Sequence, residues 1–196
     1  MKIRFSHLFL IITSSVILIF NSGCAYKLSA ESDTLPGDVK IIQIPMFAND
    51  SAEVGAEVFF TNALKLEALR SKFVTLKNDE KSAEAVLQGR ITSVDVIADE
   101  SVIEAKNTKF MPTETVLATQ YRVTVNVNLV LKRRDSSEVL WSGDFRQVSN
   151  YSAPQITLPT INTANALYNQ SAKRQTLDAL SKEMMQAAFD RMLENF

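Results

Sequence analysis

The only cysteine of the chain, Cys24, is the residue best suited to covalent chemistry, and its position restricts what that chemistry can be. It follows an uncharged apolar run, Leu8–Phe20, which itself follows the cations Lys2 and Arg4. A basic start, an apolar stretch of about 7–15 residues and then small residues are typical of a secretory signal peptide. A permanent membrane span needs about 20 apolar residues, so the run is short for that role.

Small residues directly before the cysteine predict its modification. Ser22 and Gly23 precede Cys24 in an order that resembles the lipobox of bacterial lipoproteins, although Asn21 stands where an aliphatic residue is usual. We therefore predict that residues 1–23 form a signal peptide and that Cys24 carries the lipid anchor. The alternative is an uncleaved signal anchor with a buried cysteine. Acylation would remove a lone thiol from an oxidising compartment, and several acyl chains anchor stably at ~0.8 kcal/mol per buried methylene.

The residue after the cysteine bears on which membrane holds the anchor. It is Ala25, whereas an aspartate there is the usual signal for retention in the inner membrane of Gram-negative bacteria. We therefore expect a lipid anchor in the outer membrane, with the domain on the periplasmic side.

The residue types that the predicted mature chain lacks exclude most catalytic chemistry. The sole histidine, His7, lies in the predicted signal peptide, so the mature chain has no histidine and no unmodified thiol. This excludes Ser-His-Asp and Cys-His catalysis and zinc sites built from histidine or thiolate. No GxSxG, Walker A or GxGxxG pattern is present. A carboxylate pair or a Ser-Lys dyad stays open, but the acidic residues follow ordinary surface patterns. We predict a non-catalytic protein without metal or cofactor.

Length and charge point to one folded domain. Removing residues 1–23 leaves 173 residues with a net charge of −3, enough for a single domain with a real core. The absence of a global basic field argues against nucleic acid as a partner. A hydrophobic fraction of 46% with only five glycines argues against disorder. We predict a lipidated tether over residues 24–38 and a single α+β domain over residues 39–196.

The sequence of the first half of this domain predicts a strand, a helix and a short strand, followed by a longer strand. The turn signal "LPGD" precedes a predicted strand over Val39–Phe47, with Pro45 at its end or on an edge. Asp50 and Glu53 have the spacing of a capping box, so a helix is expected over Glu53–Arg70. The predicted buried face of that helix consists of Val58, Phe59, Ala63, Leu66 and Leu69. The segments that follow are a short strand "KFVTL", a charged turn over 77–82, and a long strand over 83–97 with a bulge near Gly89.

The second half is dominated by one strictly alternating strand. From Tyr121 to Leu131 apolar and polar residues alternate, which predicts one buried and one polar face. A hairpin turn over 132–138 leads to a partner strand over 139–151, with Val139, Trp141 and Phe145 on one face. Residues 99–114 are expected to form a loop or splayed hairpin tip, and residues 152–162 a loop. Thr163 is expected to cap a final helix running to Glu194, with an apolar stripe of Leu177, Leu180, Met184, Ala188 and Met192. The expected fold is an α+β two-layer sandwich, with two helices on a mostly antiparallel four- to five-stranded sheet.

Four segments in order resemble the LptE family of lipopolysaccharide-assembly lipoproteins, partners of the LptD barrel. They are the predicted mature start "CAYKL", the strand "LPGDVKIIQIPMFAND", the strand "AEAVLQGRITSV" and the hairpin "TQYRVTVNVNLVL…EVLWSG". The resemblance covers nearly the whole predicted mature chain, and the long final helix fits it too. Asn21 and the long polar segment 99–114 depart from the family pattern.

The resemblance implies a non-catalytic subunit of the outer-membrane lipopolysaccharide translocon. Such a subunit plugs and helps assemble an LptD-like β-barrel, and it contacts lipopolysaccharide during insertion into the outer leaflet. In the family these contacts lie in the loop before the long strand and near the last helix. By resemblance to the family, these two places correspond to a first basic group, which consists of Lys106, Lys109, Lys173 and Arg174. A tip group is the second choice, Lys132, Arg133 and Arg134. For each position the alternative is an ordinary solvated surface charge.

A second function of a different class stays open at this point. The chain could be a lipoprotein subunit of another envelope assembly or secretion machine that forms homo-oligomers. Co-purification separates the two hypotheses, because the first predicts one large barrel as partner and the second predicts a ring of copies.

Overall fold

The computed structural model describes residues 34–99, 102–104, 116–118, 120–152, 155–158, 161–164 and 166–194. Cys24, the predicted signal peptide and most of the tether therefore lie outside the described residues, as do Lys106 and Lys109. The chain divides into two compact units, residues 1–30 and 31–196, and every described residue belongs to the second.

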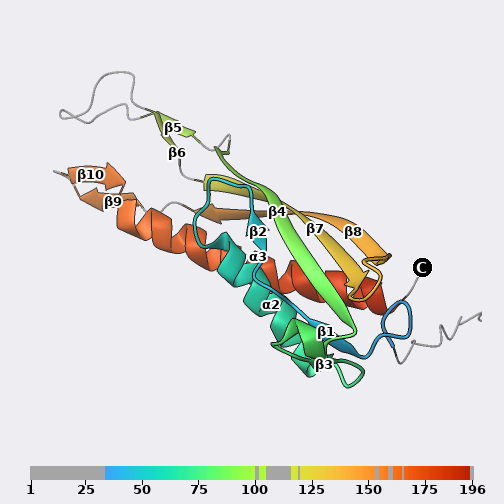
Figure 1. The fold of residues 1–196 in the computed structure, drawn as a ribbon. Helices are drawn as coiled ribbons and strands as arrows, with labels where there is room; N and C mark the ends of the chain where they lie inside the picture. Colours follow the sequence, from blue (N-terminus) through green and yellow to red (C-terminus); the bar gives the residue numbers. More distant parts are fainter. Residues whose placement is uncertain are drawn as a thin grey trace, which may run out of the picture. The chain divides into compact units, whose positions relative to one another are not determined.

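A mixed six-stranded sheet forms one layer of this unit (Figure 1). Its strand order is β3-β1-β4-β7-β8, and β2 also pairs with β4. β1 is parallel to β3 and β4, and β2 is parallel to β4, whereas β4, β7 and β8 are antiparallel neighbours. The strands are β1 Ile41–Gln43, β2 Ala48–Asn49, β3 Thr75–Leu76, β4 Ala85–Ala98, β7 Gln120–Arg133 and β8 Val139–Ser152.

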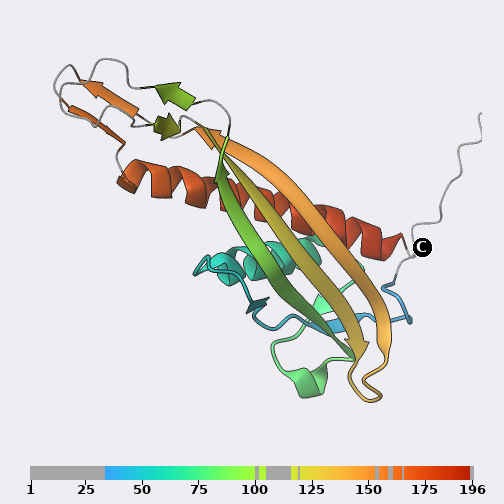
Figure 2. The same ribbon diagram turned by 90° about the horizontal axis from the view of Figure 1, so that it is seen from above.

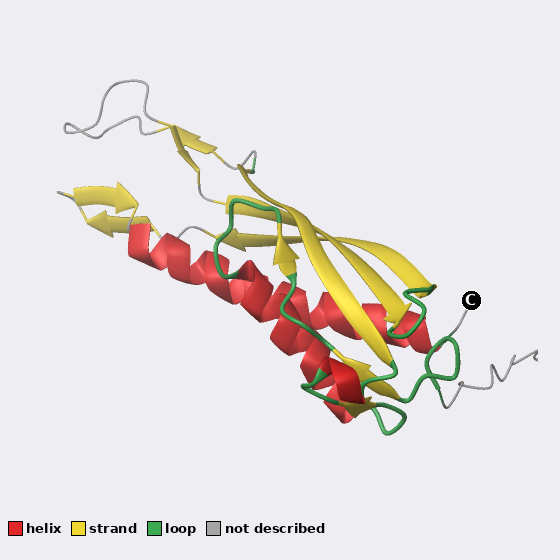
Figure 3. Ribbon diagram, in the orientation of Figure 1, coloured by secondary structure: helices red, strands yellow, loops and turns green. Residues whose placement is uncertain are grey.

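Two helices form the other layer and cover the same face of the sheet (Figures 2 and 3). They are α2, Ala56–Arg70, and α3, Ala166–Leu193. A 3₁₀ turn, η1, spans Glu80–Ser82. The remaining described strands form two small antiparallel pairs, β5 Val102–Glu104 with β6 Val116–Ala118, and β9 Gln155–Leu158 with β10 Ile161–Ala164. The predicted α+β two-layer sandwich is confirmed, with one more strand and a parallel part around β1.

The core confirms the alternation predicted for β7 and the stripe predicted for α3. Val123, Val125, Val127, Leu129 and Leu131 are all buried toward the helices, and Tyr121 packs against the core with its ring stacked on Tyr151. All five predicted stripe residues of α3 are buried as well, namely Leu177, Leu180, Met184, Ala188 and Met192. Burying one large apolar side chain contributes about 1.5–3 kcal/mol. The packing of β7 and α3 in the core is therefore the main source of the unit's stability.

The start and the buried face of α2 differ from the prediction. The helix begins at Ala56 with Gly55 as its N-cap residue at a φ of 90°, and no side chain caps it. The buried face contains Phe60, Leu64 and Ala68. Ala63 is buried and Phe59 partly buried as predicted, but Val58, Leu66 and Leu69 are exposed. The helix has apolar residues on more than one side, so periodicity alone could not choose the face that meets the sheet.

The bulge of β4 lies at Thr92 rather than at Gly89. The pairing with β7 shifts between Ile91 and Ser93, whereas Gly89 stays in regular register opposite Leu129. A Cβ at position 89 would lie 2.3 Å from Cζ of the buried Phe47 ring. The glycine is therefore required by close approach of a side chain and not by a bulge.

The first and last parts of the domain also differ in detail. The predicted strand over Val39–Phe47 is reduced to β1, and Pro45 lies between β1 and β2, as expected at a strand end. The predicted loop over 152–162 contains β9 and part of β10. Thr163 belongs to β10, so it does not cap α3, which begins three residues later.

β8 carries its own bulge, which changes the direction of one predicted residue. Leu131 pairs with Trp141 and Lys132 pairs with Val139, so Leu140 is the extra residue. Val139 consequently shares the outward direction of Lys132 and is 53% exposed, whereas Trp141 and Phe145 pack partly against the core.

Candidate functional site

The face of the sheet opposite the helices, which we call the outer face, carries the polar half of each alternating strand. In the described part of the chain no helix lies over this face (Figure 2). The register of β4, β7 and β8 places mostly hydrogen-bonding side chains on it, namely Gln88, Arg90, Ser93, Asp95, Arg122, Thr124, Asn126, Asn128, Ser142, Asp144, Arg146 and Asn150. The apolar exceptions are Val86, Ile97, Val130, Val139 and Val148. The face is thus suited to a polar rather than an apolar partner.

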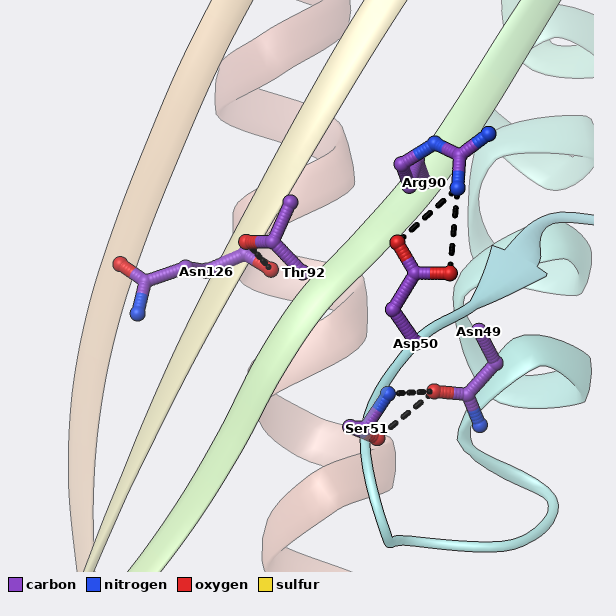
Figure 4. A network of polar contacts seen from close by, with 6 residues as sticks. All are labelled: Asn49, Asp50, Ser51, Arg90, Thr92 and Asn126. Carbon is purple, nitrogen blue, oxygen red and sulfur yellow. Dashed lines mark hydrogen bonds and ion pairs between the residues drawn. The ribbon is translucent and has the colours of Figure 1, made fainter.

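Hydrogen bonds between neighbouring strands order the outer face. Asn128 Nδ2 donates to Asp144 Oδ1 at 2.8 Å, which links β7 to β8. Asn126 Nδ2 donates to Ser93 Oγ at 2.9 Å, which links β7 to β4. At the bulge, Thr92 Oγ1 donates to the Asn126 carbonyl at 3.2 Å (Figure 4). These side chains are held in place before any partner arrives, so a partner would not have to order them.

A second polar cluster fixes the loop between β2 and α2 to the sheet (Figure 4). Asp50, predicted to cap the helix, instead accepts from Arg90 Nη1 through both carboxylate oxygens, at 3.1 and 2.9 Å. Asn49 Oδ1 accepts from the Ser51 N–H at 3.0 Å and from Ser51 Oγ at 2.6 Å. Glu57 accepts a hydrogen bond from Asn49 Nδ2 at 2.7 Å. Its own backbone N–H first, and then this Asn49 contact, lower the pKa of the Glu57 carboxyl.

The two described members of the first basic group differ in how they are held. Lys173 Nζ lies 2.7 Å from Glu53 Oε2, and the two side chains are only 24% and 21% exposed. This ion pair ties α3 to the loop before α2, so the Lys173 charge is already engaged. Arg174 is exposed to solvent.

The other two members of the first basic group, Lys106 and Lys109, belong to the segment between β4 and β7. β4 ends at Ala98, opposite Tyr121 near the start of β7, so the chain that includes Lys106 and Lys109 leaves and rejoins the sheet here. The Lys173–Glu53 pair lies near this end too, because the Glu53 charge acts on Tyr151, the cross-strand partner of Tyr121. Burial, then the Tyr121 and Glu53 charges, raise the pKa of the Tyr151 hydroxyl.

The tip group lies at the opposite end, and two of its members hold the chain rather than face solvent freely (Figures 1 and 2). Arg133 Nη2 donates to the Gly37 carbonyl at 3.3 Å, and Arg134 Nη1 donates to the Lys81 carbonyl at 3.2 Å. Arg134 also pairs with Asp135 at 2.6 Å. Three carboxylates line the cleft beside them, those of Asp38, Glu84 and Asp135.

Strand length separates the tip group from the Tyr121 end of the sheet. Tyr121 and Arg133 belong to the same extended strand, and twelve residues at about 3.3 Å each span roughly 40 Å. The Tyr121 end of β7 and the tip group are therefore too far apart to contact one small anionic head group together. Lys132 differs from its neighbours, because its register places it on the outer face.

The comparisons with known proteins identify the family. A family model described as LptE, lipopolysaccharide-assembly, matches residues 39–196. The chain belongs to the LptE family. This is a family of non-catalytic, membrane-associated lipoproteins of lipopolysaccharide assembly. No curated protein matches the sequence closely enough to count as a relative.

Solved structures of similar fold include several lipoproteins. A minor lipoprotein from Acinetobacter baumannii is 14% identical, with a TM-score of 0.41 over 79% of this chain and 96% of that one. Lipoprotein GNA1162 from Neisseria meningitidis is 12% identical, with a TM-score of 0.41 over 72% of this chain and 98% of that one. A PelC dodecamer from Paraburkholderia phytofirmans is 10% identical, with a TM-score of 0.46 over 83% of this chain and 90% of that one.

The described residues contain neither a membrane-spanning helix nor a group of metal ligands. None of the described helices is both long and apolar enough to cross a membrane. Across the part of the chain that the structure describes, no three His, Cys, Asp or Glu side chains gather in a way that could hold a metal ion.

The sequence did not reveal the polar contacts that join distant segments. Arg90 with Asp50 and Lys173 with Glu53 are separated by 40 and 120 positions. Alternation alone indicated that Asn126 and Asn128 face away from the core, but their partners on β4 and β8 follow only from the register. No local pattern carries that information.

Proposed function

We propose that this LptE-family chain is an outer-membrane lipoprotein subunit of the lipopolysaccharide translocon. Its domain, residues 39–196, plugs an LptD-like β-barrel, helps it assemble, and contacts lipopolysaccharide on its way to the outer leaflet. In this proposal residues 1–23 are the signal peptide, Cys24 carries the lipid anchor and residues 24–38 are the tether. The family match over residues 39–196 is the observation that carries the proposal.

The outer face gives the plug role a physical basis. The interior of a large outer-membrane barrel is polar. A plug must therefore present hydrogen-bonding groups to it, because a buried polar group without a partner costs about 1–3 kcal/mol. The amides, hydroxyls and charges of the outer face suit such a wall. Val123, Val125 and Val127 of β7 need no partner, because they are already buried under the helices.

The proposed lipopolysaccharide-contact residues are chosen by their charge and by whether that charge is already paired. Lipopolysaccharide carries phosphates, and a predicted mature chain of net charge −3 must meet them with a local basic surface. Within the first basic group, Arg174 is exposed, whereas Lys173 is paired with Glu53. Arg133 and Arg134 of the tip group already donate to carbonyls beside three carboxylates. We therefore retain Lys106, Lys109, Lys173 and Arg174 as the proposed contact group, with Lys106, Lys109 and Arg174 as its anion-receiving members.

A pull-down in mild detergent tests the proposal. Tagged full-length chain, extracted from membranes of cells that also express the native outer-membrane proteins, should retain one large β-barrel protein in equal amount. The intact mass of the same preparation should begin at an acylated Cys24. A ring of copies without a barrel would support the homo-oligomeric alternative instead, and a mature chain that retains residues 1–23 would contradict the anchor.

A further inference from the structure

The outer face is hollowed where β4 and β7 pass the connection between β1 and β2. The pocket there has a volume of about 440 Å³, and the side chains that line it include Met46, Gln88, Arg90, Asn128, Val130 and Lys132. Position 90 on β4 lies opposite position 128 on β7, and Lys132 lies four residues further along β7, or about 13 Å away. Two long cationic side chains therefore reach the pocket from different directions.

The charge of this pocket is unbalanced. The described residues that line it include two cations, Arg90 and Lys132, but no aspartate or glutamate. Arg90 Nη1 already donates to both carboxylate oxygens of Asp50, which stands outside the lining (Figure 4). Within the described part of the chain, the half-buried Lys132 side chain has no hydrogen-bond or ion-pair partner. Buried charges in proteins are normally paired, so Lys132 is suited to an anion that the described chain does not supply.

The other lining side chains restrict the size and shape of that anion. Asn128 Nδ2 already donates to Asp144, whereas the exposed Gln88 amide has no such partner among the described residues. Met46 is 58% exposed, and its sulfur accepts a hydrogen bond from Thr61 Oγ1 at 3.3 Å, which fixes this apolar wall. A pocket with an apolar wall, a neutral donor and one unpaired cation suits a short side chain that ends in a single carboxylate.

Position and charge favour a protein carboxylate over a phosphate of lipopolysaccharide. Lys132 lies eleven residues along β7 from Tyr121, or about 36 Å, so the pocket is far from the end of the sheet where the chain of Lys106 and Lys109 is attached. A phosphate monoester carries about −1.5 to −2 at neutral pH, which exceeds the one unpaired charge of Lys132. The pocket instead belongs to the outer face, which is the surface proposed to meet the barrel wall.

We propose that this pocket receives the side-chain carboxylate of one aspartate or glutamate on the inner wall of the barrel partner, with Lys132 Nζ as its main donor. The inference rests on the proposed plug role and adds to it the chemistry of one contact. Charge-assisted hydrogen bonds are strong, and charged contacts across an interface fix its register. The contact would therefore set the orientation of the domain inside the barrel.

Charge reversal at Lys132 tests the proposal by co-purification of the barrel with tagged, full-length chain. Lys132→Glu should reduce the retained barrel at least about tenfold, because it places two carboxylates together. Lys132→Gln should cause a smaller loss, and it replaces the first variant in the test if circular dichroism shows that variant to be unfolded. Lys72→Glu is the matched control, because it makes the same charge change at an exposed site just after α2 and should retain the barrel.

The possible failures are distinguishable. If the unmodified chain retains a barrel and both Lys132 variants retain it equally well, the pocket proposal is overturned and the proposed function stands. If the unmodified chain retains no barrel, both are overturned. Loss of binding to purified lipopolysaccharide in Lys132→Glu, with the barrel still retained, would assign the pocket to a phosphate and would also overturn the proposal.

A reciprocal charge exchange tests the partner residue. A photo-reactive amino acid in place of Gln88, which is exposed in the pocket, should cross-link to a barrel segment that contains an aspartate or glutamate. Replacing that acid by lysine should weaken retention by the unmodified chain and restore retention by the Lys132→Glu chain. A cross-linked segment without an acidic residue, or an exchange that restores nothing, would contradict the proposed contact.

Discussion

At the scale of single residues, Gly89 shows how a close contact outweighs a local preference. Replacing a strand glycine by alanine normally stabilises by about 0.4–1 kcal/mol through the unfolded chain. Here the new methyl group would lie 2.3 Å from Cζ of Phe47. That ring cannot move easily, because it is 3% exposed and the Phe47 N–H donates to Thr61 Oγ1 at 3.0 Å. Overpacking costs about 1–3 kcal/mol, so it should win.

Gly89→Ala should therefore lower the free energy of unfolding by about 1–3 kcal/mol in urea titrations. Phe47→Leu in the same chain removes part of the ring, so the double variant should lose less than the sum of the two single losses. Additive losses, or an unchanged Gly89→Ala chain, would show that the glycine is not held by this contact.

Glu84 should make the stability of the domain depend on acid. Its carboxylate accepts the N–H groups of Lys40 at 2.8 Å and Ile41 at 3.1 Å, and these bonds lower the pKa of Glu84 below the ordinary 4.5. The stabilisation is present above pH 4.5 and disappears as the pH falls through the lower folded pKa. Glu84→Gln should lower the melting temperature at neutral pH and reduce its fall in acid. The matched control, Glu80→Gln in the neighbouring turn, should keep the slope of the unmodified chain.

The proposed lipopolysaccharide contact is tested by replacing its basic side chains together in one variant. Lys106→Glu, Lys109→Glu and Arg174→Glu together should weaken binding of purified lipopolysaccharide by more than tenfold, and more so at low salt. Lys173 is left unchanged, because its removal would strand Glu53 and disturb the fold. Glutamate at Lys132, Arg133 and Arg134 is the comparison. Loss of binding only in the comparison variant would move the site to the tip.

At the scale of elements, β7 is the strand on which the sheet depends. Val125 is fully buried between β4 and β8, whereas Asn126 points to the outer face. Val125→Asp buries an unpaired carboxylate and should cost several kcal/mol of a typical total of about 5–15. Asn126→Asp should cost less than about 1.5 kcal/mol, since it exchanges one donor hydrogen bond to Ser93 on a hydrated face. Similar melting temperatures for the two variants would contradict the assigned facing.

The elements also show what can be predicted from a sequence and what cannot. The alternation of β7 and the stripe of α3 are local patterns, and both led to the correct buried residues. The start of α2 could not be predicted, because Asp50 reads as a cap until Arg90 is known to lie beside it. Gly89 could be taken for a bulge position until Phe47 is known to fill the space over it, and the bulge lies at Thr92 instead.

The proposed site shows the same division. The charges of Lys173 and Arg174 are visible in the sequence, but the partner that separates their roles, Glu53, lies 120 positions away from Lys173. The order of four short segments was enough to indicate the LptE family, because the family is recognised by their combination.

At the scale of the whole molecule, helices cover one face of the sheet and leave one polar face open to a partner. The family is one of lipopolysaccharide assembly, so we propose that the partner belongs to the same machinery. The proposed barrel contact uses this outer face.

A cross-linker on the outer face of β4 is the sharpest test of the proposed barrel contact. Asp95 is exposed on the outer face, two strands away from the edge of β8. A photo-reactive amino acid at position 95 of the full-length chain, activated in living cells, should form an adduct with one large outer-membrane β-barrel protein. Asp190, exposed on α3, serves as the comparison position on the helical layer. A position-95 adduct that is absent, or that contains no barrel protein while the variant is folded and membrane-bound, would contradict the account.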